Sequence, residues 1–241
     1  MTPPMTFGQR IGLAGVYLER YGLSLVFIVL ASLRIHHLIA LDPHERSEIA
    51  ASPLIEILGQ IVWVQFYLYV GLLLLFGHRV MAPPRNLTDL IIPLGATFFY
   101  LSYSAIPWLP LALQKNLCPA NWQTSCAAIG MGFNLVGLCI DVWAAIHLGR
   151  SFGVFIEVRK PVLEGAYRWV RHPMYLGHLC FLTGFAILNF SVAFFILVPL
   201  HIFLLLYRAR LEENRLAEVS PEYAEYRKRT GFIFPKFSRT S

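Results

Sequence analysis

Five long apolar stretches dominate this sequence of 241 residues and limit the folds that are open to it. An α-helix needs about 20 mostly apolar residues to cross the hydrocarbon core of a bilayer. Backbone polar groups inside that core must be satisfied within the segment itself, so apolar stretches of this length are expected to be helices. With 56% hydrophobic and 14% charged residues, the composition excludes an ordinary soluble domain. Four stretches have the length of one span, and we place them at residues 18–38, 54–76, 88–109 and 127–147.

The fifth stretch, residues 178–207, is 30 residues long, which is too long for one untilted span. Asn189, Phe190 and Ser191 interrupt it near its middle. We therefore predict a tight helical hairpin with both ends on the same side of the membrane; one long tilted helix is the alternative. The predicted fold is an all-α, polytopic integral membrane protein with a single domain, residues 1–241. It has four N-terminal spans (1–148), the hairpin, and an amphipathic helix in the tail, with tyrosines on one face and cations on the other.

The lysine and arginine residues are distributed unevenly around these predicted spans. If the fifth stretch is a hairpin, 17 of the 20 basic residues fall on one side of the membrane. The other side holds only Arg46 and Lys115, with Arg34 near its interface. Because short cytoplasmic segments carry an excess of lysine and arginine, the N-terminus and the C-terminal half (149–241) are predicted to be cytoplasmic. We expect a bacterial-type inner membrane.

The charge and the cysteines restrict the partners further. The net charge of +6 follows from the predicted topology and suits a lipid bilayer with anionic headgroups. No nucleic-acid partner is expected, because no basic stripe interleaved with stacking aromatics lies on a soluble module. No metal is expected either, since the four cysteines lack ligand spacing. Cys118 and Cys126 share a non-cytoplasmic loop, where they could pair as a disulfide or remain free thiols.

Two polar clusters lie at opposite ends of the fifth stretch, at residues 165–177 and 208–213. A hairpin would bring them together and build a site at the membrane surface. In the first cluster, Pro173 restricts His172 to extended geometry and can start a helix, so His172 is expected at a helix mouth with Tyr175 in the first turn.

In the second cluster, Arg208 and Glu212 are four residues apart and share one helical face. They form either an ordinary surface ion pair or part of a polar cavity at the membrane exit. Asp141 lies inside the fourth predicted span, where a carboxylate is either functional or a structural hydrogen-bond partner. No motif includes it, and we leave it out of the candidate site.

The spacing of these residues resembles one known family. The run Gly165-x-Tyr167-x-x-x-Arg171-His172-Pro173-x-Tyr175-x-Gly177, followed by Arg208-x-x-x-Glu212-Glu213, is similar to the isoprenylcysteine carboxyl methyltransferase family. This superfamily also includes phospholipid N-methyltransferases and bacterial thiol S-methyltransferases. The resemblance covers roughly residues 149–235, which we call the catalytic half, whereas the four N-terminal spans contribute hydropathy only.

The resemblance implies a membrane enzyme that binds S-adenosylmethionine without a Rossmann domain. In agreement, the Gly130-x-Gly132 pair lies inside a span and lacks the third glycine and the strand of a dinucleotide fingerprint. The implied substrate-side catalytic residue is Arg208. The implied cofactor-binding residues are Lys160, Pro161, Val162, Tyr167, His172, Pro173, Met174, Tyr175 and Glu212. Arg159 differs from the residue that eukaryotic enzymes tend to have there, so its contact is expected through the backbone only.

The expected activity is S-adenosylmethionine-dependent methylation of a carboxylate on a lipophilic or prenylated acceptor, most like protein-S-isoprenylcysteine O-methyltransferase. Methylation of a thiol or of a phospholipid amine is the runner-up. An NADPH-dependent sterol-type reductase on a related scaffold is an alternative from a different class. A non-enzymatic membrane scaffold would leave the two polar clusters unexplained.

Overall fold

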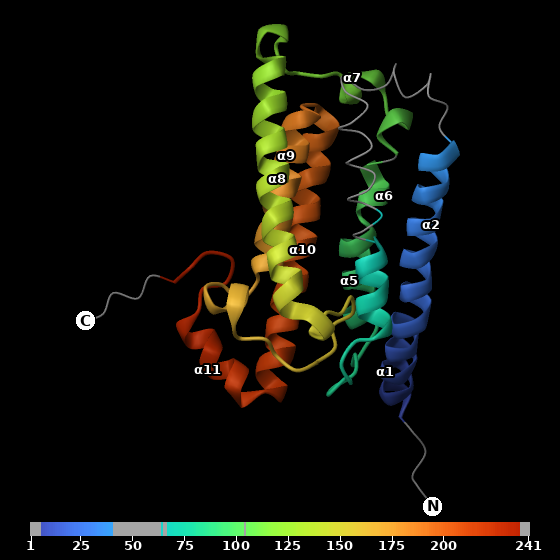
Figure 1. The fold of residues 1–241 in the computed structure, drawn as a ribbon, viewed down its shortest axis with the longest axis vertical. Helices are drawn as coiled ribbons and strands as arrows, with labels where there is room; N and C mark the ends of the chain where they lie inside the picture. Colours follow the sequence, from blue (N-terminus) through green and yellow to red (C-terminus); the bar gives the residue numbers. More distant parts are fainter. Residues whose placement is uncertain (1–5, 41–63, 65–66, 104, 237–241) are drawn as a thin grey trace, which may run out of the picture.

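The computed structural model describes residues 6–40, 64, 67–103 and 105–236. In this part of the chain the fold is helical, and its only extended pairings are three isolated bridges. The long helices run side by side as one bundle, with the segment after α8 and the tail helix gathered at one end (Figure 1). The predicted all-α class is confirmed.

The N-terminal helices form one continuous rod. It consists of α1 (Phe7–Tyr17), a π-helical turn η1 (Leu18–Leu23) and α2 (Ser24–Ala40). Residues 7–33 are long and apolar enough to cross a membrane, so this span begins earlier than the predicted residue 18. About half of the predicted span 54–76 lies outside the described residues, and among the rest, residues 64 and 67–75 are helical.

The predicted span 88–109 is broken into α5 (Thr88–Phe98), α6 (Tyr100–Tyr103) and a 3₁₀ turn η2 (Ile106–Trp108). The helix axis bends by 40° at this break. A histidine from another helix explains part of the irregularity, because His201 Nε2 lies 3.0 Å from the carbonyl oxygen of Ala96. A side chain inserted into a helical hydrogen-bond ladder is a recognised cause of a kink.

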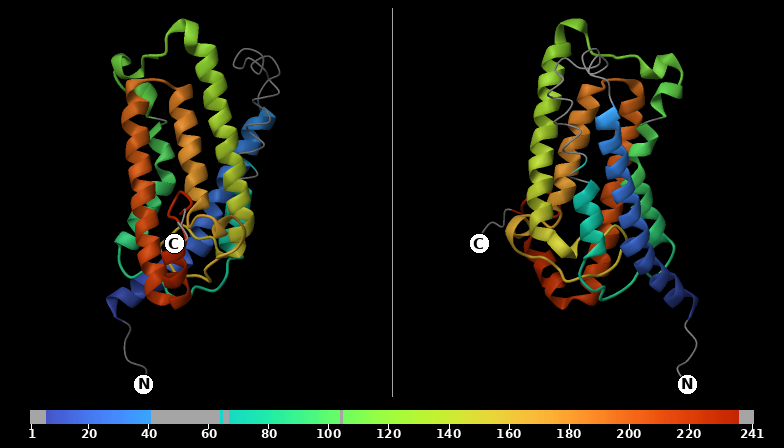
Figure 2. Two further views of the ribbon diagram at one scale, coloured as in Figure 1. Left: turned by 90° about the vertical axis from the view of Figure 1, so that its left-hand side faces the viewer. Right: turned by 45° about the vertical axis from the view of Figure 1, so that its right-hand side comes forward.

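The predicted span 127–147 and the predicted hairpin are both confirmed as helical elements. After α7 (Leu111–Gln114) and η3 (Ala120–Trp122), α8 covers Gln123–Leu148. The fifth apolar stretch forms α9 (Pro173–Leu188) and α10 (Val192–Val219), which turn at Asn189–Ser191. Figure 2 shows α10, α9 and α8 side by side, with α9 and α10 antiparallel. In the described residues, three helices are long and apolar enough to span a membrane, or four if the bent pair counts as one.

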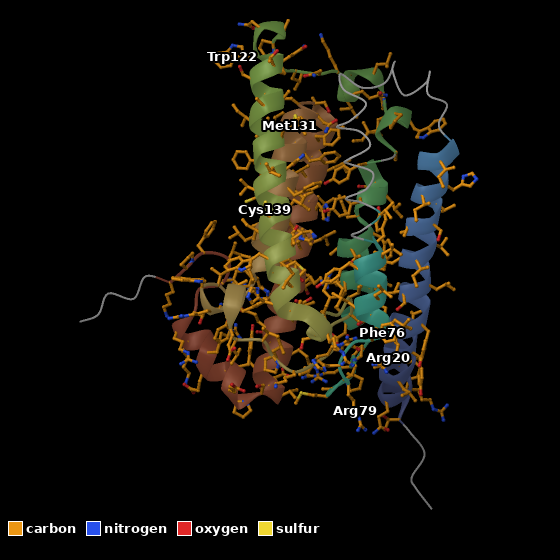
Figure 3. The ribbon with its side chains drawn as sticks, viewed as in Figure 1. Arg20, Phe76, Arg79, Trp122, Met131 and Cys139 are labelled. Carbon is orange, nitrogen blue, oxygen red and sulfur yellow. The ribbon has the colours of Figure 1, made fainter. Side chains whose placement is uncertain are left out.

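The outer surface of the bundle is apolar, as expected of an integral membrane protein. Trp122 of η3 and Met131 and Cys139 of α8 lie along the outer side of the bundle, and Met131 is 49% exposed (Figure 3). Arg20 and Arg79 gather at the other end, beside Phe76. Soluble proteins rarely expose large contiguous apolar surfaces, so this surface indicates contact with lipid.

Glycines allow α8 and α9 to approach closely. A Cβ atom on Gly137 of α8 would lie 2.7 Å from the Gly177 carbonyl oxygen and from the Phe181 nitrogen of α9. A Cβ atom on Gly184 of α9 would lie 2.5 Å from the Gly130 carbonyl oxygen. Membrane helices associate through such small residues because backbones can then make van der Waals contact. This contact fixes α9, which starts at the candidate site, against α8.

We expect Gly137→Ala to destabilise the bundle by roughly 1 to 3 kcal/mol, because the added methyl group must push α9 away. The measurement is the midpoint of thermal unfolding in detergent. Gly132→Ala is the matched control, since Gly132 lies on the same helix and a methyl group added there would have no neighbouring atom within 4 Å. Equal midpoints for the two variants would contradict the glycine contact.

Candidate active site

The two polar clusters meet at the end of the hairpin, as the sequence predicts. Pro173 occupies the first turn of α9 and His172 precedes it as the N-cap. The hydroxyl of Tyr175, in that first turn, donates a hydrogen bond of 2.9 Å to Glu212 Oε1 of α10. A tyrosine from one arm of the hairpin is therefore joined to a carboxylate from the other.

Arg208 is held by three separate parts of the chain. Its Nε donates to Glu212 Oε1 at 2.8 Å, one turn further along α10. Its Nη1 donates to Thr97 Oγ1 of α5 at 3.0 Å, and its Nη2 donates to the carbonyl of Gly153 at 3.2 Å. The Arg208 side chain is 11% exposed and the Glu212 side chain 22% exposed. The pair is thus a partly buried element of the site and not an ordinary surface ion pair.

Glu213, the next residue, is fully buried and was not among the predicted site residues. Its carboxylate accepts from Nε of Arg171, and it lies 3.4 Å from Nε of Arg227 and 3.8 Å from Nη1 of Arg210. Arg171 also donates to the carbonyls of Arg227 and Thr230. Glu213 therefore connects α10 to the segment before α9 and to the tail helix α11 (Pro221–Arg229).

His172 is packed inside this network and is only 6% exposed. Its ring lies edge-on between Tyr175 and Phe232, with centroid separations of 5.2 and 4.9 Å. Its Nε2 lies 3.3 Å from Glu213 Oε1. The backbone of residues 170–172 pairs with the chain after α11, since the amide of His172 donates to the carbonyl of Phe232 at 3.1 Å. Sequence reasoning gave no signal for this return of the tail.

Tyr167 lies in the short turn η5 (Gly165–Arg168) and packs with Ala144, Val162 and Met174. Its carbonyl accepts a hydrogen bond from the hydroxyl of Tyr226 in α11. Burial raises the pKa of Tyr226 to about 12 and raises the pKa of Tyr167 as well. Both phenols therefore stay protonated at physiological pH, and the hydroxyl of Tyr226 can donate its hydrogen bond to the carbonyl of Tyr167.

The tail helix has the predicted two faces. Tyr223 and Tyr226 are buried against the rest of the catalytic half, whereas Lys228 is 71% exposed at its side chain. Pro221 starts the helix, and the hydroxyl of Ser220 caps it by accepting from the amide of Tyr223 at 3.2 Å. The two tyrosines thus hold α11 beside Tyr167 and Glu213.

The segment from 149 to 164 is docked through buried charges. Arg159 donates to Glu19 at 2.6 Å, to Glu157 at 2.7 Å and to the carbonyl of Phe152 at 2.6 Å. Its guanidinium group therefore contacts residues that precede it in the chain. Of the three predicted cofactor residues in this segment, Lys160 is exposed, whereas Pro161 and Val162 are half-buried.

Asp141 makes a structural contact between helices. Its Oδ1 lies 3.1 Å from Nδ1 of His178 in α9, and that ring nitrogen is also 2.9 Å from the carbonyl of Met174. A Cβ atom on Gly177 would lie 2.3 Å from Asp141 Oδ1, so Gly177 makes room for the carboxylate. This is the helix-to-helix hydrogen bond that the sequence left open.

Comparisons with known proteins agree with this architecture. The family description "Phospholipid methyltransferase" matches residues 125–222, which contain α8, the hairpin and both polar clusters. The protein-S-isoprenylcysteine O-methyltransferase of Rattus norvegicus is 26% identical over 194 residues, covering 74% of this chain and 68% of the rat protein. The enzyme of the same name from Saccharomyces cerevisiae is 32% identical over 119 residues, covering 46% of this chain and 49% of the yeast protein.

These matches make the chain similar to membrane methyltransferases, and the matched residues contain both polar clusters. It is also 34% identical over 113 residues to the cobalt-zinc-cadmium resistance protein CzcN of Cupriavidus metallidurans. That match covers 46% of this chain and 48% of CzcN, so the chain spans about half the length of that relative. Across the residues that the structure describes, no group of three histidine, cysteine, aspartate or glutamate side chains could hold a metal ion.

Replacement of Glu213 tests whether the buried carboxylate holds residues 149–236 together. We expect Glu213→Gln to lower the free energy of unfolding by about 3 to 5 kcal/mol, because the buried network of three arginines loses its counter-charge. The measurement is thermal unfolding followed by tryptophan fluorescence.

The control is Glu225→Gln on α11, where the carboxylate is 71% exposed and pairs only with Lys228 among the described residues. That exposed pair contributes little, so the control should unfold at the wild-type temperature. A Glu213→Gln variant that also unfolds at that temperature would show that the arginines are held by other contacts.

Proposed function

We propose that this protein is an integral-membrane, S-adenosylmethionine-dependent methyltransferase that esterifies a carboxylate on a lipophilic acceptor. A prenylated cysteine is the favoured acceptor class, because relatives of this chain carry the name protein-S-isoprenylcysteine O-methyltransferase. The observation that carries the proposal is the contact of Arg208, Glu212 and Tyr175 where the hairpin leaves the apolar part of the bundle. The catalytic half, with the N-terminus, is proposed to face the cytoplasm of a bacterial-type inner membrane.

The residues around this contact fit the parts of S-adenosylmethionine. When bound, the cofactor supplies a methyl group activated by its sulfonium centre. Glu212 would hold the cationic amine, since part of its carboxylate is open to solvent while Tyr175 and Arg208 fix its position. Tyr167, with Val162 and Met174 beside it, would offer an apolar wall. We assign the remaining cofactor contacts to Lys160, Pro161, His172 and Pro173.

Arg208 would orient the acceptor. A guanidinium group has five N–H groups in a planar fork. Contacts to Glu212, Thr97 and Gly153 use three of these among the described residues, which leaves two to pair with a carboxylate. Because Arg208 comes one turn before Glu212 on the apolar helix α10, it lies on the bilayer side of the cofactor residues.

The transfer itself is an in-line displacement, in which an acceptor oxygen bonds to the methyl carbon as the carbon–sulfur bond breaks. Alignment of the two reactants can supply several kcal/mol of the barrier reduction. A carboxylate acceptor is already ionised and requires no base. A thiol or amine acceptor would require one, and His172 is buried between Tyr175 and Phe232 beside Glu213. Because His172 is packed in this way and is the candidate base, a carboxylate acceptor is favoured over a thiol or an amine.

Binding of S-adenosylmethionine to Glu212→Gln tests the cofactor assignment. We expect the affinity for the cofactor to fall about 10-fold or more, because a charge-assisted contact with its amine is lost. Isothermal titration calorimetry on the purified protein measures this loss, and NADPH titrated in parallel tests a reductase. Wild-type affinity in the variant would remove Glu212 from the cofactor site, and binding of NADPH alone would overturn the proposed function.

Replacement of Arg208 separates acceptor from cofactor. Arg208→Lys keeps the charge but loses the planar fork, so we expect kcat/KM to fall about 30- to 150-fold, the equivalent of about 2 to 3 kcal/mol. Cofactor affinity should stay near the wild-type value. Equal losses of turnover and of cofactor affinity would place Arg208 in the cofactor site, and retained turnover would indicate a neutral acceptor.

A further inference from the structure

Two thiols lie in contact at the end of the bundle opposite the candidate active site. Cys118 is 8% exposed in the connection between α7 and η3, and Cys126 is half-buried in the first turns of α8. Their sulfur atoms are 3.1 Å apart, and the thiol of Cys118 donates toward the sulfur of Cys126. Figure 1 shows the start of α8 and α7 at one end of the molecule and α11 at the other.

The segment that carries Cys118 also binds the turn of the α9–α10 hairpin. We call residues 115–119 the strap. The amide of Leu117 donates to the carbonyl of Phe190 at 2.7 Å, and Asn116 forms an antiparallel bridge with Ser191. The side chain of Asn116 keeps the strap bent by accepting from the amide of Cys118 at 2.8 Å. The strap therefore connects the beginning of α8 to the α9–α10 turn.

The space around the thiols allows a reagent to reach them. A cavity of about 160 Å³ is lined by both cysteines together with Asn116, Gln123 and Leu188. A second cavity, of about 250 Å³, lies beside it and shares Asn116 and Leu188 with the first. The sulfur atoms need to approach by only about 1 Å to reach disulfide bonding distance.

We infer that Cys118 and Cys126 form a reversible disulfide that fastens the strap to α8 and so fixes the hairpin turn. The reaction is thiol–disulfide exchange with a small-molecule or protein disulfide. Cys126, the more exposed thiol, loses its proton and attacks the oxidant's disulfide, which releases one thiolate. Cys118 then loses its proton and attacks the mixed disulfide at the Cys126 sulfur, which releases the second thiolate. Two electrons and two protons pass from the cysteine pair to the oxidant.

The pair differs from the other two cysteines in a way that suits this role. Cys139 is exposed on the outer side of α8, and Cys180 lies in α9, so both belong to apolar helices (Figure 3). The Cys118–Cys126 pair instead lies at the helix ends, beside the polar side chains of Asn116 and Gln123. If the candidate site faces a reducing cytoplasm, the opposite end of the bundle faces the compartment in which disulfides persist.

The test uses the full chain in membranes with Cys139 and Cys180 replaced by alanine. The protein is first equilibrated with oxidised or reduced glutathione. Its free thiols are then blocked with N-ethylmaleimide, and the intact mass is measured before and after reduction. We expect no N-ethylmaleimide adduct on the protein equilibrated with oxidised glutathione, and two on the protein equilibrated with reduced glutathione. Two adducts after equilibration with oxidised glutathione would overturn the inference.

A second measurement tests the connection to the hairpin. We expect oxidation to raise the unfolding temperature by about 5 °C and to slow amide hydrogen exchange in the strap and at residues 189–191. The Cys118→Ser variant should show neither change between the two glutathione conditions. Faster or equal exchange in the oxidised wild type would overturn the coupling. No methyl acceptor is involved, so these results are independent of the proposed function.

Discussion

A carboxylate without solvent contact must be neutralised by its neighbours, and Glu213 meets this requirement with guanidinium groups from three parts of the chain. Arg171 precedes α9, Arg210 lies on α10 with Glu213 itself, and Arg227 belongs to α11. An uncompensated charge at this depth would cost several kcal/mol, so the buried carboxylate depends on these cations. Since His172 also faces Glu213, the start of α9 is set by the same carboxylate. Because Tyr175 lies in the first turn of α9, its position against Glu212 follows from where α9 starts.

Irregular backbone beside a membrane must find partners for its polar groups, and here the helices supply them. Pro93 has no amide hydrogen, which frees the carbonyl of Asp89 in α5. That carbonyl accepts from the amide of Ile156 at 3.1 Å. Glu19, in the π-helical turn, accepts from the amides of Val154 and Phe155 at 3.1 and 2.6 Å. Two departures from regular helix therefore hold the segment from which Gly153 reaches Arg208.

Much of this arrangement could be predicted from the sequence because its signals are local. A 30-residue apolar stretch with Asn189, Phe190 and Ser191 in its middle predicts a hairpin, and a hairpin brings its two charged ends together. The helix boundaries were harder to predict. α10 runs on to Val219, twelve residues past the end of the apolar stretch, and the ion pairs Arg208–Glu212 and Arg215–Glu218 lie along this extension.

The remaining features depend on contacts distant in the sequence. Glu212 and Glu213 are neighbours, and only the rotation of α10 decides that the first faces Tyr175 and the second faces Arg171. Part of the irregularity in the predicted span 88–109 comes from His201, about 100 residues later. The return of Phe232 to His172 follows from the docking of α11, which composition does not encode. Which residues contact cofactor and acceptor stays a prediction.

The glycine contact between α8 and α9 also determines which side of the hairpin can move. Backbone touches backbone there, at Gly137 with Gly177 and at Gly130 with Gly184, so sliding one helix past the other would force atoms into overlap. On the opposite side, α10 meets α5 through side chains, at Arg208 with Thr97 and at His201 with Ala96. Side chains can adjust their rotamers, whereas packed backbones cannot yield in that way. We therefore expect the hairpin to move more readily on its α5 side than on its α8 side.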